Sequence, residues 1–292
     1  MDIYEMLLVL TACFFAASMG YHYAGAIVGP AYGGKAISLK LGLMVSALLV
    51  IIGSLATPVI YTYIKLAQLD NREYLSSLLA SAIATTIATY IKVPTSTIQI
   101  FAFSVIGSAV MDGKYIEIPS VFNIISSWVL APSLSYLLAP VIRKVIPNSV
   151  GNKILILTMC YSALVLGLND VSNAASPMIG AGLDEYISRF TSGALMGAGL
   201  MIWGSRLARF IGREIGISDI RSFLAAHITK ATILTALNTL GLNASMNQTL
   251  IGALAGIGVE KKVITRIIAG WIYSPMLGFT LSVVFTAIVN II

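Results

Sequence analysis

The segment GLNDVSNAASPMIGAG, residues 167–182, decides how this chain is to be understood. It lies between apolar runs, yet it contains Asn169, Asp170, Ser172 and Asn173 together with a proline and several glycines, which makes it a poor continuous helix in lipid. A carboxylate at membrane depth costs on the order of 2.5–3.5 kcal/mol and is a functional-site hypothesis by default. We expect Asp170 to coordinate a cation, accept a proton or pair with a lysine. The alternative is a short loop outside the membrane in which Asp170 caps a helix.

The composition is that of a protein with many membrane-spanning helices. Of the 292 residues, 58% are hydrophobic and only 10% are charged, and the mean hydropathy is +0.91. A soluble domain carries about 25% charged residues, so a soluble enzyme is excluded, and the abundance of apolar surface excludes intrinsic disorder. The net charge of +6 comes from basic residues in short loops, which we interpret as a topology signal. No nucleic-acid partner is expected.

The chain divides into two similar halves, residues 1–145 and residues 153–292, joined by a short basic linker. Each half contains six apolar segments, and landmarks of the first half recur in the second at offsets of 143–149 residues. An internal duplication of this kind is typical of secondary transporters. The matching landmarks are Gly20 and Gly167, Pro30 and Pro177, Ser96 and Ser245, Gln99 and Gln248, Gly107 and Gly256, Trp128 and Trp271, and Pro132 and Pro275.

The charge distribution predicts the topology. If residues 20–38 and 167–184 enter the membrane and return to the same side, each half crosses five times and the halves have opposite orientations. With the linker in the cytoplasm, 13 of the 18 Lys and Arg residues then fall inside and 4 outside, in agreement with the positive-inside rule. The sequence therefore predicts an all-α polytopic protein of the cell membrane. It has two inverted repeats of about five transmembrane helices each, plus re-entrant or broken helices, and both termini are external.

A second polar cluster consists of VPTSTIQ (93–99) and its counterpart NASMNQT (243–249). Pro94 is expected to end one helix, so that the hydroxyl residues after it stand at the start of the next helix. Free N–H groups and the positive end of the dipole favour an anion there. The alternative is ordinary helix capping without a ligand. The candidate residues are Thr95, Ser96, Thr97 and Gln99 in the first copy and Ser245, Asn247 and Gln248 in the second.

These motifs resemble those of the inorganic phosphate transporter (PiT) family. GLNDVSNAASP is similar to its GANDVANAxGP signature, and PTSTIQ and ASMNQT are similar to degenerate copies of its PVSTTH motif. The resemblance covers nearly the whole chain. It implies an inverted-repeat symporter, often a homodimer, that holds an oxyanion between these segments. Together with the clusters above, the expected substrate-binding residues are Asn169, Asp170, Ser172, Asn173, Thr95, Ser96, Thr97, Gln99, Ser245, Asn247 and Gln248.

The first copy of the signature departs from the family pattern. It has become GYHYAGA, in which His22 and Tyr23 stand where the family has Asn and Asp, and Ala26 stands where it has the last Asn. This degeneracy resembles that of the proton-coupled sulfate permeases of the family, so phosphate and sulfate both stay open as substrates. We expect proton coupling through Asp170, with Tyr23 and His22 as further coupling residues and His22 either relaying the proton or acting as a hydrogen-bonded spacer. The alternative coupling ion is sodium, held by Asp170 and Asn173. No cofactor is expected.

Three classes of function remain. The first is a secondary transporter of phosphate or sulfate, the second a passive anion channel, and the third a non-transporting sensor or assembly paralogue. No HExxH, Walker A, GxSxG or paired-cysteine motif occurs, so we do not expect an enzyme. His227 and Lys230 lie one helical turn apart and are expected to extend to the membrane interface.

Overall fold

The computed structural model of the protein describes residues 2–56, 66–149, 151–217, 219–240, 242 and 244–291. Asn243, the first residue of the second polar cluster, lies outside the described residues. The helices in chain order are α1 (Ile3–Gly33), α2 (Leu39–Ala56), α3 (Asn71–Tyr90), α4 (Thr97–Met111), α5 (Ile118–Val145), α6 (Asn152–Asn169), α7 (Ser172–Gly180), α8 (Glu185–Trp203), α9 (Ser205–Arg209), the π-helix η1 (Phe210–Glu214), α10 (Ile220–Thr239), α11 (Met246–Ile257) and α12 (Lys261–Val289).

Several of these helices are long and apolar enough to cross a bilayer. Among the described residues, length and composition identify five spans: α1, α2, α5, the α6–α7 pair and α12. Their outer faces leave large apolar side chains exposed, such as Leu48, Leu137 and Ile272. An apolar outer face suits lipid, which solvates aliphatic side chains as well as the protein interior does. The prediction of an all-α polytopic membrane protein is confirmed.

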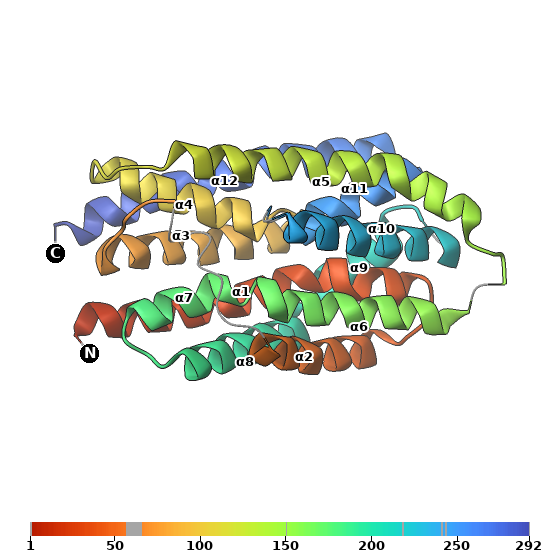
Figure 1. Ribbon diagram of the computed structural model, residues 1–292, viewed down its shortest axis with the longest axis horizontal. Coiled ribbons are helices and arrows are strands. Elements are labelled where there is room, and N and C mark those ends of the chain that lie inside the picture. Colours follow the sequence, from red (N-terminus) through yellow and green to blue (C-terminus); the bar gives the residue numbers. More distant parts are fainter. Residues whose placement is uncertain are drawn as a thin grey trace.

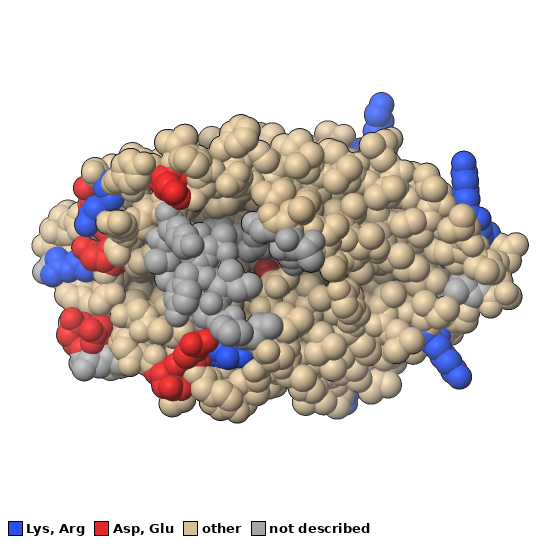
Figure 2. Space-filling model, in the orientation of Figure 1, with Lys and Arg blue, Asp and Glu red and all other residues tan. Residues whose placement is uncertain are grey.

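The two ends of the molecule differ in charge. The long helices run along its longest axis, with both termini at one end and the connection between α5 and α6 at the other (Figure 1). On the face shown in Figure 2, acidic side chains gather mostly at the end that carries the termini, whereas only Lys and Arg project from the opposite end. Capping boxes that contain acidic residues begin two of the helices: Asp2 with Glu5 begins α1, and Asp70 with Glu73 begins α3.

The first copy of the signature lies inside one unbroken helix. Because α1 runs from Ile3 to Gly33, the prediction that residues 20–38 form a re-entrant or broken segment is wrong. Its alanines and glycines are compatible with a helix, and no series of short polar side chains competes for the backbone. Pro30 removes one helical hydrogen bond, but the carbonyl of Ala26 that would accept it is bonded by Lys230 instead.

The second copy does break the helix, as predicted. α6 ends at Asn169, Asp170 and Val171 form a turn, and α7 begins at Ser172. Asn, Asp and Ser side chains in series offer the backbone alternatives to helical hydrogen bonds, which explains the break. α7 continues the course of α6 toward the end that carries the termini (Figure 1), so this segment is a broken crossing and not a re-entrant one.

The chain reverses direction inside the molecule at the second polar cluster. α3 and α4 form one helical hairpin, which lies toward the end with the termini, and α10 and α11 form another in the opposite half (Figure 1). In the first hairpin the helix ends at Tyr90, Lys92 adopts a left-handed conformation with φ of 59°, and Pro94 keeps the chain extended before α4. The expected effect of Pro94 is therefore confirmed.

Candidate anion-binding site

Four segments bring polar side chains together in the core. They are the middle of α1, the start of α4, the break between α6 and α7, and the start of α11. All of the sequence-predicted site residues are buried except Asn169, which is half-buried. The buried set is His22, Tyr23, Thr95, Ser96, Thr97, Gln99, Asp170, Ser172, Asn173, Ser245, Asn247 and Gln248.

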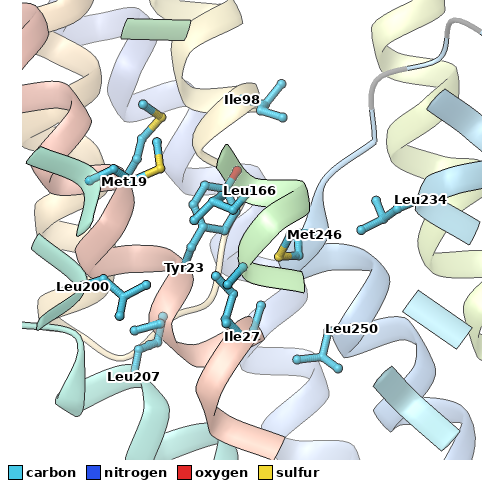
Figure 3. Close-up of a cluster of buried hydrophobic side chains, with 14 of the residues drawn as sticks. Met19, Tyr23, Ile27, Ile98, Leu166, Leu200, Leu207, Leu234, Met246 and Leu250 are labelled. Carbon is cyan, nitrogen blue, oxygen red and sulfur yellow. The ribbon is translucent and has the colours of Figure 1, made fainter. Parts of the chain in front are cut away.

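Asp170 lies in the core and not in a loop outside the membrane. It is only 7% exposed, so the alternative of an external capping residue is wrong. The hydroxyl of Tyr23 donates a hydrogen bond of 2.8 Å to Oδ1 of Asp170, and the hydroxyl of Thr97 donates one of 2.8 Å to the Tyr23 oxygen. Figure 3 shows Tyr23 projecting from α1 among apolar side chains, including Ile27 and Leu166. A chain of hydrogen bonds thus joins α4, α1 and the helix break in the core of the protein.

The two hairpins present equivalent helix starts to this region. Ser96 caps α4 by accepting the N–H of Gln99, and Ser245 caps α11 by accepting the N–H of Gln248. The other N–H groups of each first turn have no partner within the helix, and both dipoles place positive charge at these ends. Two helix starts on facing hairpins therefore create a region that favours an anion.

Direct hydrogen bonds hold the hairpin tips together. The side-chain nitrogen of Gln99 donates to the side-chain oxygen of Gln248 over 3.2 Å, and Nδ2 of Asn247 donates to the carbonyl oxygen of Thr95 over 2.8 Å. The carbonyl of Thr95 fixes which end of the Asn247 amide is the donor. Oδ1 of Asn247 is then a buried acceptor without a hydrogen-bond partner among the described residues. Such an atom suits a ligand that brings an O–H group or a cation.

His22 ties the first hairpin to α1. Thr89 donates its own proton to the carbonyl of Thr85, so its oxygen accepts from Nδ1–H of His22 over 2.6 Å, and Nε2 of His22 accepts the N–H of Thr95 over 3.1 Å. The neutral ring therefore has both nitrogens bonded. Nε2 also lies 3.0 Å from the carbonyl oxygen of Thr95, which is an acceptor for a protonated ring. Both expected roles, spacer and relay, are compatible with this geometry.

The residues after Asp170 line the break. Ser172 and Asn173 are buried at the start of α7, and the N–H of Asn173 bonds the carbonyl of Asp170 over 3.1 Å. Asn169 ends α6 beside them. Carbonyl, amide and carboxylate oxygens are ligands that sodium accepts, so a cation at Asp170 and Asn173 is chemically consistent with this donor set. No group of three or more His, Cys, Asp or Glu side chains able to hold a metal ion occurs in the part of the chain that is described.

The sequence did not indicate how three residues support the segments that form the site. Thr89 supports His22, and the indole N–H of Trp271 donates to the carbonyl of Pro94 over 2.9 Å, which fixes the extended strand before α4. Lys230 is fully buried and bonds the carbonyl of Ala26, so the expectation that it extends to the interface with His227, which is also fully buried, is wrong. Trp271 and Lys230 were visible in the sequence, but only the fold shows what they contact.

The comparisons with known proteins identify a family of transporters. The model of the family described as "Phosphate transporter family" matches residues 19–154 and again residues 147–264. A candidate phosphate permease of Methanocaldococcus jannaschii is 24% identical over 271 residues, which cover 89% of each chain. The sulfate permease CysP of Bacillus subtilis is 25% identical over 307 residues, covering 95% of this chain and 86% of the permease.

A solved structure shares the fold. It is described as "The sodium-dependent phosphate transporter", and it superposes with a TM-score of 0.88 over 100% of both chains at 17% sequence identity. At this identity the likeness establishes the fold alone.

Proposed function

The chain belongs to the phosphate transporter family, and from this premise we propose that it is a secondary transporter of a tetrahedral inorganic anion, phosphate or sulfate. The observation that carries the proposal is the meeting of two helix starts, capped by Ser96 and Ser245, in a buried region that also holds Asp170. Hydroxyl, amide and backbone N–H donors bind an oxyanion without introducing fixed charge. The helix break beside them is non-helical backbone of the kind that lines substrate sites in transporters.

Phosphate is the first substrate to test. Monohydrogen phosphate has one O–H group, and Oδ1 of Asn247 is a buried acceptor whose orientation is fixed by its neighbour. Asp170 offers further acceptor oxygens. Sulfate near neutral pH has no proton to donate and leaves these acceptors without a partner. Sulfate stays the second candidate, supported by the degenerate first signature and by the similarity to a sulfate permease.

We propose protons as the coupling ions. Tyr23 and Ala26 stand where the family signature supplies a carboxylate and an amide, so the first half lacks the side-chain oxygens of a sodium cage. Asp170 has the chemistry to take up and release a proton, and the Tyr23 hydroxyl already bonds it. Moving an uncompensated charge against an inside-negative potential costs about 2.3 kcal/mol per 100 mV, so an oxyanion needs co-transported cations. Sodium coupling is the alternative, supported by the similarity to a sodium-dependent phosphate transporter.

An inward proton gradient is expected to drive uptake of labelled phosphate or sulfate, and a sodium gradient at constant pH is expected to add little. The measurement uses proteoliposomes in which each gradient is imposed alone. A protonophore should abolish accumulation, and liposomes without protein give the background. Strong sodium-driven uptake at constant pH would contradict proton coupling. Flux that never exceeds equilibrium would favour the passive channel, and binding without flux would favour the sensor or assembly paralogue.

We further propose that residues 1–145 and 153–292 are inverted repeats, with the linker in the cytoplasm, both termini external, and the protein in the cell membrane as a homodimer. The excess of basic side chains at the linker end in Figure 2 supports this orientation. Equivalent helix starts, at Asp70 before α3 and at Asp219 before α10, would then face opposite sides.

Cysteine labelling can test this topology. In a background that lacks Cys13 and Cys160, Asp70→Cys is expected to react with an impermeant maleimide only from outside the cell, and Asp219→Cys only after the membrane is opened. Both positions are exposed and both precede a helix, so the two variants are matched. Labelling of both cysteines from the same side would refute the inverted arrangement.

A further inference from the structure

Lys230 is a buried cation that the proposed transport cycle has not yet used. It lies in the middle of α10, is 0% exposed, and donates one hydrogen bond of 2.7 Å to the carbonyl oxygen of Ala26 on α1. An ammonium group has three N–H donors. Within the described ranges, the structure gives Lys230 no carboxylate partner at ion-pair distance and no second acceptor. An isolated charge in such surroundings is costly unless another charge compensates for it.

The carbonyl that Lys230 bonds is free because of a proline. Pro30 lies four residues after Ala26 and has no N–H to donate, so the helical hydrogen bond to the Ala26 carbonyl cannot form. The second half repeats this relation, since Pro177 lies four residues after Asn173 in α7. Each signature therefore presents one backbone carbonyl without its helical partner, and in the first half that oxygen is taken by Lys230.

Lys230 contacts α1 one helical turn after the residues that α1 contributes to the candidate site. Ala26 follows His22 and Tyr23 by one helical turn on the same side of α1, a rise of about 5.4 Å. Tyr23 in turn bonds Asp170 and Thr97. Lys230 therefore links the first signature, on α1, to the hairpin formed by α10 and α11. The second helix of that hairpin, α11, begins after its cap Ser245.

We propose that Lys230 supplies a positive charge to the anion site, which takes the place of one mobile cation on the side of the first signature. This inference rests on the proposed function. An arriving oxyanion compensates the buried ammonium, and the ammonium offsets part of the desolvation cost of the anion. The ammonium group next to the carbonyl of Ala26 disfavours a second cation there, so that among the described residues the second signature, with Asp170 and Asn173, is the favoured place for a mobile cation.

A purely structural role for Lys230 makes a different prediction. In that case the side chain only fastens α10 to α1, and any side chain that donates a hydrogen bond to Ala26 would serve. Lys230→Gln keeps an N–H donor and removes the charge, whereas Lys230→Arg keeps both. These two variants separate the charge from the hydrogen bond.

The test is equilibrium binding of radiolabelled phosphate and sulfate to purified protein in lipid nanodiscs at fixed pH and salt. We expect Lys230→Gln to weaken anion binding by about 30-fold or more and Lys230→Arg to stay within about 3-fold of the unmodified protein. The exposed Lys153→Gln is the matched control and should bind normally. Wild-type affinity in Lys230→Gln would overturn the proposal.

A second comparison covers the case in which Lys230→Gln does not fold. The double variant Asp170→Asn/Lys230→Gln removes both buried charges and is compared with Asp170→Asn alone. Weaker anion binding in the double variant supports Lys230 as an anion partner, and equal binding overturns it, because Lys230 would then only balance Asp170. Absence of binding by the unmodified protein would instead overturn the proposed function itself, and the role of Lys230 with it.

Discussion

Asp170→Asn is expected to abolish proton-driven accumulation of the anion while leaving the protein folded. The amide has nearly the shape of the carboxylate, and its oxygen can still accept the Tyr23 hydroxyl, so the link between α1 and the helix break persists. The amide, unlike the carboxylate, cannot take up and release a proton during transport. The loss of one co-transported charge lowers the accumulation ratio by about 50-fold at a potential of 100 mV. Uptake into proteoliposomes under an imposed proton gradient and potential measures the effect.

The control for this variant is Asp184→Asn. Asp184 is an exposed cap at the start of α8, where Asn caps equally well, so both folding and accumulation should be unchanged. Folding of each variant is checked by size-exclusion chromatography and thermal unfolding in detergent. If Asp170→Asn accumulates the anion to the wild-type level and responds to a protonophore in the same way, Asp170 does not take part in coupling.

Ser96→Asp and Ser245→Asp are each expected to eliminate anion binding. Aspartate is as good a helix cap as serine, so α4 and α11 should still begin at the same residues. Its charge, however, would lie where the anion is proposed to bind. Two like charges about 4 Å apart repel by about 4 kcal/mol at an effective dielectric constant of about 20, which corresponds to a loss of affinity of about 1,000-fold. Equilibrium binding of labelled phosphate measures this.

Ser96→Asn and Ser245→Asn provide matched controls. Asparagine has the size of aspartate and caps helices equally well, but it is neutral. Any loss that the Asn variants share with the Asp variants is steric, and the remainder is electrostatic. If the Asp variants bind phosphate as tightly as the Asn variants, the anion does not lie at these helix starts.

Much of the architecture could be predicted from the sequence because lipid imposes simple constraints. Long apolar segments had to be helices, and Pro94 had to end one of them. The break at Asp170 followed from consecutive Asn, Asp and Ser side chains, whose competition with backbone hydrogen bonds is local. For the same reason the two helix starts at Ser96 and Ser245 could be identified as candidate anion sites.

The errors concern residues whose behaviour depends on distant parts of the chain. α1 continues through Pro30 because a lysine 204 residues from Ala26 takes the carbonyl that the proline leaves free. His22 finds its partners on α3 and in the segment before α4, so a polar residue that would disturb an isolated helix is satisfied here. No local pattern distinguishes a lysine that reaches the interface from one that reaches another helix. Tertiary contacts decided both cases.

The hydrogen bonds between the hairpin tips would couple anion binding to the separation of the two hairpins. Two hydrogen bonds join the hairpins at the proposed anion site, one between Gln99 and Gln248 and one between Asn247 and Thr95. An oxyanion that competes for the same side-chain amides would weaken these hydrogen bonds as it binds. The free energy needed to separate the hairpins would then be lower in the anion-bound form than in the anion-free form, so that little of the gradient would be dissipated without anion transport.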